Sequence, residues 1–135
     1  MIDKQKFIND FSAVIHDLAN QIMVISILQS KKKDYSISFA EFKVFKKKCF
    51  SLLGLLAKEI IIADLEPYGQ IVKNNCLEFE AAVKQNDRDK MEFWSNKIIN
   101  SLTKCLKMLE TNLGVKAIME KGIHSSENIT LRKSL

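Results

Sequence analysis

Apolar residues recur at three- and four-residue spacing along nearly the whole chain, and this periodicity limits the fold more than any other feature. In the first segment the recurring positions are Phe7, Phe11, Val14, Leu18, Ile22 and Ile25. Such spacing places the apolar side chains on one side of an α-helix. The 135 residues include four glycines and one proline, so few positions interrupt the pattern. The sequence therefore predicts an all-α protein.

Capping and breaking residues divide the pattern into four predicted helices. Asp3 is a suitable N-cap for the first helix, which we expect to end near Ser30. Ser38 and Glu41 have the spacing of a capping box and predict the start of the second helix. That helix should end before Pro67, because proline disfavours helical geometry in the residue before it.

The third and fourth helices have their own boundary signals. Pro67 fits the first turn of the third helix, which we expect to end near Gln85. Asp87 can cap the fourth helix, and Gly114 is a natural stop signal. The predicted apolar stripe of the third helix is Ile71, Val72, Cys76, Phe79, Ala82 and Val83; that of the fourth is Met91, Trp94, Ile98, Leu102, Cys105, Leu109 and Leu113.

The second helix has the widest apolar arc. Its stripe consists of Phe42, Phe45, Cys49, Leu52, Leu53, Leu56 and Ile60, and Phe50, Leu55 and Ile62 extend it. A helix that is apolar over most of its circumference is typical of a buried position. We therefore expect this helix to be the most buried of the four.

Four amphipathic helices joined by short connections favour an antiparallel up-down-up-down four-helix bundle. The predicted bundle covers residues 1–113, and residues 114–135 are expected to form a weakly ordered C-terminal tail. In an alternative architecture, the first two helices form a hairpin that pairs with the same hairpin of a second copy, which gives a homodimer. The pattern is compatible with both.

Charge, cysteines and the N-terminus bear on partners and location. The net charge of +5 favours acidic partners in general. The sequence contains no basic stripe with interleaved aromatic residues, so we do not expect nucleic acid to be the partner. Lys58 and Glu59 interrupt the best candidate for a membrane-spanning run, residues 52–63, and the N-terminus lacks the apolar core of a signal peptide. The three cysteines lie on apolar stripes, as expected of buried thiols in a reducing compartment. We therefore expect a cytoplasmic protein with no membrane contact, metal or cofactor.

The run His16-Asp17-Leu18-Ala19-Asn20 is the main candidate site. At 100° per residue, His16 falls opposite the apolar stripe of its helix, and Asn20 lies one turn beyond it. We expect His16 to point to solvent. A neutral imidazole can accept a phosphoryl group, Asp17 can orient the ring or accept its second proton, and Asn20 can hydrogen-bond phosphoryl oxygens.

Residues 16–25, His-Asp-Leu-Ala-Asn-Gln-Ile-Met-Val-Ile, resemble the H-box helix of the dimerisation and histidine-phosphotransfer domains of bacterial two-component sensor kinases. The resemblance implies that His16 is the phosphoacceptor, Asp17 the assisting acid or base, and Asn20 the residue tied to phosphatase activity. It covers about ten residues and, loosely, the predicted hairpin with the second helix. Gln21 stands where many such kinases have proline.

The chain shows no sign of ATP binding, because it has neither the boxes of a kinase ATP-binding domain nor a P-loop. The predicted function is histidine phosphotransfer in a phosphorelay, between His16 and the aspartate of a response-regulator receiver domain. A sensor kinase is a further candidate partner. The residues expected to contact the partner are Ala13, Gln21, Met23 and Ile27.

Two alternatives use the same helix. In a receiver phosphatase, Asn20 or Gln21 would place an amide beside the phosphoaspartate of the receiver and orient water, and His16 would be dispensable. In a non-catalytic adaptor, the helix would bind a receiver domain without chemistry, and His16 would be an ordinary surface residue.

Overall fold

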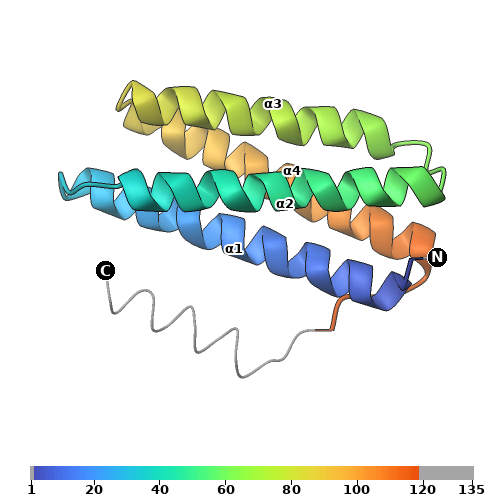
Figure 1. Ribbon diagram of the computed structural model, residues 1–135. Coiled ribbons are helices and arrows are strands. Elements are labelled where there is room, and N and C mark those ends of the chain that lie inside the picture. Colours follow the sequence, from blue (N-terminus) through green and yellow to red (C-terminus); the bar gives the residue numbers. More distant parts are fainter. Residues whose placement is uncertain (1, 119–135) are drawn as a thin grey trace.

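The computed structural model describes residues 2–118 and contains four helices that pack side by side as a four-helix bundle (Figure 1). The helices are α1, Lys4–Ser30; α2, Ser36–Glu59; α3, Leu65–Lys84; and α4, Arg88–Leu113. The predicted fold class is confirmed. The predicted tail lies outside the described residues from residue 119 onward.

The four helices do not contact one another equally. The contact between α3 and α4 is the largest, followed by α1 with α2 and then α1 with α4. The contact between α2 and α3 is the smallest of the four, and α1 lies diagonally across the bundle from α3. The bundle is therefore most open along the seam between α2 and α3.

Three of the predicted helix ends are confirmed by their hydrogen bonds. Asp3 Oδ1 accepts a hydrogen bond from the Lys6 N–H at 3.1 Å, and Asp87 Oδ1 accepts one from the Lys90 N–H at 3.2 Å. Gly114 ends α4 with φ 72°, a left-handed conformation that suits glycine. These residues satisfy backbone groups that the helix itself leaves without partners.

The predicted start of α2 is wrong. The helix begins at Ser36, before the expected capping box of Ser38 and Glu41. Asp34 Oδ1 accepts a hydrogen bond from the Ser36 N–H at 2.9 Å, and this bond lowers the pKa of the Asp34 carboxyl. The side chain that organises this turn is therefore Asp34. At the other end α2 stops at Glu59, well before Pro67, which lies in the first turn of α3.

The core is formed by one stripe from each helix. All six predicted stripe residues of α1 are buried, and the Phe42 and Phe79 rings lie 5.2 Å apart between α2 and α3. The buried apolar residues are Phe7, Ile8, Phe11, Val14, Leu18, Ile22, Ile25, Phe42, Cys49, Leu53, Leu56, Leu65, Val72, Cys76, Phe79, Ala82, Val83, Met91, Ile98, Leu102, Cys105, Leu109 and Leu113.

The expectation that α2 is the most buried helix is wrong. Only Phe42, Cys49, Leu53 and Leu56 are buried in it, whereas α1, α3 and α4 each bury more residues. Leu55, one of the residues expected to extend the buried arc, is 55% exposed. The predicted stripe of α3 also needs correction at Ile71, which is 50% exposed.

Polar side chains also connect the helices. Lys46 Nζ and Glu80 Oε2 form an ion pair between α2 and α3. Asn75 Nδ2 of α3 donates hydrogen bonds to the Lys97 carbonyl and to Ser101 Oγ of α4, both at 3.2 Å. Because Asn75 and Ser101 are buried, these bonds satisfy groups that are costly to leave unpaired in a core.

Among the described helices, α1 alone is long and apolar enough to cross a membrane. The expectation that residues 52–63 are the best candidate is therefore corrected. In the bundle, the apolar stripe of α1 is buried against the other helices, as in the core helix of a helical bundle. Length and composition alone are weak evidence for a membrane span.

Candidate functional site

The candidate motif lies in the middle of α1, on the side that the core does not use. The stripe of Phe11, Leu18 and Ile25 faces the other helices, so the helical period turns residues 16 and 20 away from it. His16, Asp17 and Asn20 are all half-buried, and none belongs to the hydrophobic core. The structure therefore places the imidazole and the amide one turn apart on the outer side of α1.

The expectation that His16 points freely to solvent needs correction. The side chain is half-buried, and its Nε2 atom is shielded from water. The imidazole is therefore less accessible than its position on the helical wheel predicts. The helical wheel places a residue on a side of its helix, but it contains no information on what lies over that side.

A chain segment crosses the same side of α1 near its N-terminus. Gln5 Nε2 donates a hydrogen bond to the Lys116 carbonyl at 2.7 Å, and Asn9 Oδ1 accepts one from the Ile118 N–H at 2.9 Å. Asn9 lies two turns before His16 on the outer side of α1. The segment that follows α4 is thus fixed to the side that carries the candidate site, a feature that no sequence pattern predicts.

A groove of about 620 Å³ runs between α1 and α2 beside the motif. It brings together two of the predicted residues, Asp17 and Ala13, with side chains of α2 that were not predicted to belong to a site. Its lining is Asp10, Ala13, Val14 and Asp17 from α1, and Val44, Lys47, Lys48, Ser51 and Leu52 from α2. The α1 wall carries carboxylates and the α2 wall carries ammonium groups, so the groove presents both charges to a partner.

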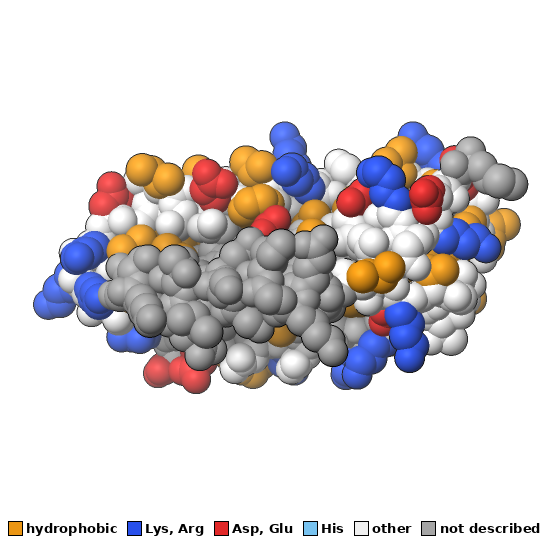
Figure 2. All heavy atoms as spheres, turned by 90° about the horizontal axis from the view of Figure 1, so that it is seen from below, with side chains coloured by type: hydrophobic (Ala, Val, Ile, Leu, Met, Phe, Trp, Pro, Cys, Tyr) orange, Lys and Arg blue, Asp and Glu red, His pale blue; other side chains and the backbone are white. Residues whose placement is uncertain are grey.

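The helical spacing of the α2 residues that line this groove is a signal that the sequence contains. Val44, Lys48 and Ser51 are separated by four and three residues, which places them on one side of α2. In the structure Lys47 and Lys48 are exposed, and they line the groove where α2 borders α1. Figure 2 shows one surface of the molecule on which basic, acidic and apolar side chains are interspersed.

The remaining predicted contact residues lie around the motif. Gln21, Met23 and Ile27 are half-buried, Ala13 is exposed, and none of them is in the core. Gln21 follows Asp17 by one turn and so lies toward α2, while Ile27 continues the side of α1 that carries His16. The predicted set is thus spread over the outer surface of α1.

The cysteines lie away from this surface. Cys49, Cys76 and Cys105 are free and buried, from α2, α3 and α4 respectively. Burial raises the pKa of all three thiols, to about 12 for Cys76 and about 11 for Cys105. Neutral buried thiols are poor nucleophiles. Within residues 2–118, no cluster of three or more His, Cys, Asp or Glu side chains could hold a metal ion.

Comparison of the chain with models of protein families, with curated proteins and with solved structures finds no match. The bundle defines the class of architecture, and what the site does has to be argued from its residues.

Proposed function

We propose that this protein is a histidine phosphotransfer component of a bacterial two-component phosphorelay. His16 exchanges a phosphoryl group with the aspartate of a response-regulator receiver domain. The observation that carries the proposal is the position of His16, Asp17 and Asn20 on the outer side of a central bundle helix, outside the core. A sensor kinase is a second candidate partner, and the cytoplasm is the expected location.

The transfer needs only groups of the two proteins. The lone pair of an unprotonated imidazole nitrogen forms the N–P bond, while the P–O bond to the receiver aspartate breaks and the aspartate leaves as a carboxylate. Asp17 accepts the proton that the other ring nitrogen releases. Asn20 donates its amide N–H to a phosphoryl oxygen, and the reverse reaction returns the phosphoryl group to the receiver.

The groove between α1 and α2 supports docking next to this site. Ile37, Val44 and Leu55 are exposed by 78%, 52% and 55%, and their spacing places them along one side of α2. Exposed apolar side chains rimmed by charges mark protein interaction surfaces. Lys47 and Lys48 lie in the same groove and would attract a partner with an acidic rim.

A receiver phosphatase is the second candidate, and the shielding of the His16 Nε2 atom favours it. In this function the amide of Asn20 or Gln21 orients a water molecule that attacks the phosphoaspartate of the receiver. This reaction does not require the phosphoryl group to reach the imidazole of His16. A helical adaptor that only binds receivers would use the same surface without chemistry.

The test is to incubate the protein with phosphorylated receiver domains and to look for acid-labile, base-stable label on the chain. Phosphotransfer predicts label on the wild type and none on His16→Gln. Asn100→Ala on the exposed surface of α4 is a control that should behave as wild type. Label that persists in His16→Gln would overturn the assignment of His16.

The same reaction distinguishes the alternatives. Dephosphorylation of the receiver that survives His16→Gln but disappears in Asn20→Ala would establish the phosphatase. Charge reversal of Lys47 and Lys48 should weaken receiver binding, whereas reversal of Lys104 and Lys107 on α4 should not. If the protein binds the receiver but takes up no label and does not dephosphorylate the receiver, the adaptor function is the one supported.

A further inference from the structure

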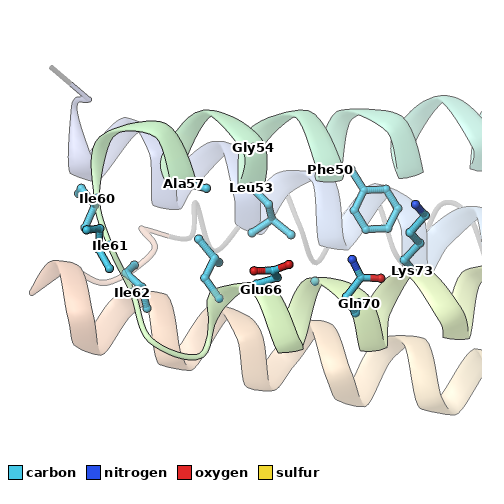
Figure 3. Close-up of a pocket in the computed structure, with 12 residues that line it drawn as sticks. Phe50, Leu53, Gly54, Ala57, Ile60, Ile61, Ile62, Glu66, Gln70 and Lys73 are labelled. Carbon is cyan, nitrogen blue, oxygen red and sulfur yellow. The ribbon is translucent and has the colours of Figure 1, made fainter.

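A second groove, of about 530 Å³, follows the open seam between α2 and α3 (Figure 3). Apolar side chains of α2 and of the α2–α3 connection form one wall and one end of it. Polar side chains of α3 form the other wall. Its lining is Phe50, Leu53, Gly54, Ala57, Ile60, Ile61, Ile62, Leu65, Glu66, Gly69, Gln70 and Lys73.

Two glycines line this groove. A Cβ atom added to Gly54 on α2, or to Gly69 on α3, would meet no other atom within 4 Å. Both residues line the groove, so each helix presents bare backbone there. Glycine at such positions lets a further helix approach the backbone closely.

The groove ends at the most exposed apolar residue of the described chain. Ile61 is 99% exposed and lies in the connection between α2 and α3, beside the half-buried Ile60 and Ile62. Leaving such a cluster in water is unfavourable, because burial of large apolar side chains stabilises a folded or associated protein. A contiguous apolar patch of this kind marks an interaction surface.

The charges of the α3 wall point to one kind of partner. Glu66 and Lys73 are seven residues apart, which places them on the same side of α3, about 10 Å apart along its axis. Both point into the groove in Figure 3. Within residues 2–118 neither has an ion-pair partner. Gly69 and Gln70 lie midway between them.

This pattern is complementary to itself. If a second α3 helix lies antiparallel across the first at Gly69, Glu66 of each copy faces Lys73 of the other. A two-fold axis makes both pairs equivalent, as in the isologous interface of a homodimer. The glycine at the crossing point permits the close approach that these pairs need.

We propose that the α2–α3 groove is the self-association surface of this protein and that its occupant is a second copy of the chain. The two-fold axis passes near Gly69, the Glu66–Lys73 pairs form the rim, and the apolar cluster at Ile61 becomes covered. The observations are independent of the proposed function. Because α1 lies diagonally across the bundle from α3, both copies of His16 stay outside the interface.

The experiment measures the mass of the full chain by sedimentation over micromolar to near-millimolar concentrations. Wild type should shift reversibly from monomer to dimer. Lys73→Glu places a carboxylate opposite Glu66 of the other copy in both rim pairs, and this repulsion should weaken dimerisation by about tenfold. Glu66→Lys places two ammonium groups opposite each other and should have a similar effect. Lys84→Glu, on the exposed end of α3, is the matched control and should dimerise as wild type.

The double variant Glu66→Lys with Lys73→Glu is the decisive measurement. It restores two opposite-charge pairs in a two-fold dimer, so it should recover wild-type dimerisation. Circular dichroism on each variant checks that the helices remain folded. A chain that is monomeric throughout the range would overturn the proposal. So would a dimer that the single charge reversals leave unchanged, or one that the double variant fails to restore.

Discussion

Lys46 Nζ lies 2.6 Å from Glu80 Oε2, so an ion pair joins α2 and α3, the two neighbouring helices that touch least. The side chains are only 21% and 12% exposed, which makes the pair far less hydrated than the Lys6–Asp10 pair at the surface of α1. Lys46 precedes Phe50 by one turn of α2 and Glu80 follows Lys73 by two turns of α3, so helical spacing places the pair beyond this end of the α2–α3 groove.

Removing one partner of this pair should destabilise the fold. Glu80→Gln leaves the Lys46 ammonium without its counter-charge, and we expect a loss of roughly 2–3 kcal/mol in the free energy of unfolding, near the lower end of the range for buried pairs. The measurement is urea unfolding followed by circular dichroism. The exposed pair gives the control, because Asp10→Asn should cost no more than about 0.5 kcal/mol.

The double variant Lys46→Met with Glu80→Leu should recover most of the stability lost in Glu80→Gln. Apolar residues of similar volume remove both charges, so no unpaired charge is left in the seam. A double variant as unstable as the single one would show that packing, rather than charge, is what this position requires.

The buried thiols should make the fold less stable in alkali. In the unfolded chain a thiol ionises near pH 9.0, while burial raises the pKa of Cys105 to about 11. Between these values the unfolded state has lost a proton that the folded state retains. Stability therefore falls as the pH rises through this window, by at most about 1.4 kcal/mol per pH unit for each thiol.

Urea unfolding at a series of pH values from 8 to 11 tests this, with Cys105→Ala as the comparison. All other ionisable groups are common to both proteins, so the difference between the two slopes reports on Cys105. The stability of Cys105→Ala should fall less steeply than that of wild type. Equal slopes would mean that Cys105 ionises as easily in the folded protein as in the unfolded one.

Much of the fold could be predicted from the sequence because local rules determine it. The stripe of α1 from Phe7 to Ile25, the caps Asp3 and Asp87, and the stop at Gly114 each depend on neighbours within a turn or two along the chain. Such features are encoded in spacing and residue type. The start of α2 was not predicted, because two nearby residues, Asp34 and Ser38, can each cap a helix and the structure uses Asp34 to bond the Ser36 N–H.

The burial of α2 and the groove beside Asp17 were beyond prediction because they depend on which helices touch. The wide apolar arc of α2 is compatible with a buried helix or with one that leaves Leu55 and Val44 exposed. Periodicity gives the direction of a side chain but not the distance to the next helix. The hydrogen bond from the Ile118 N–H to Asn9 Oδ1 is likewise long-range.

Two glycines should respond in opposite directions to alanine. Gly54 is inside a helix with open space around it, so Gly54→Ala should stabilise the monomer by about 1 kcal/mol. Gly114 has φ +72° and equally open space, so Gly114→Ala should destabilise by about 1–2 kcal/mol through its backbone alone. Thermal unfolding at low protein concentration measures both. Effects of equal sign would contradict the assigned backbone conformations.

Asn75 should be the most sensitive polar position of the α3–α4 seam. In Asn75→Leu the Ser101 hydroxyl and the Lys97 carbonyl lose the amide that bonds them, and we expect a loss of about 1–3 kcal/mol. The exposed neighbour Asn74→Leu is the control and should change stability by less than about 0.5 kcal/mol. Chemical denaturation compares the two.

The bond from Asn75 to Ser101 also fixes the alignment of two helices whose contact is otherwise largely apolar. Two apolar helix surfaces can also pack after one helix slides along the other by one turn, about 5.4 Å. The Asn75 amide, in contrast, can bond its partners on α4 in only one alignment of α3 and α4. Such a slide would carry residues 116–118 away from Gln5 and Asn9. Because α4 leads directly into residues 116–118, the amide that holds α4 in register with α3 also helps to hold this segment on the side of α1 that carries His16.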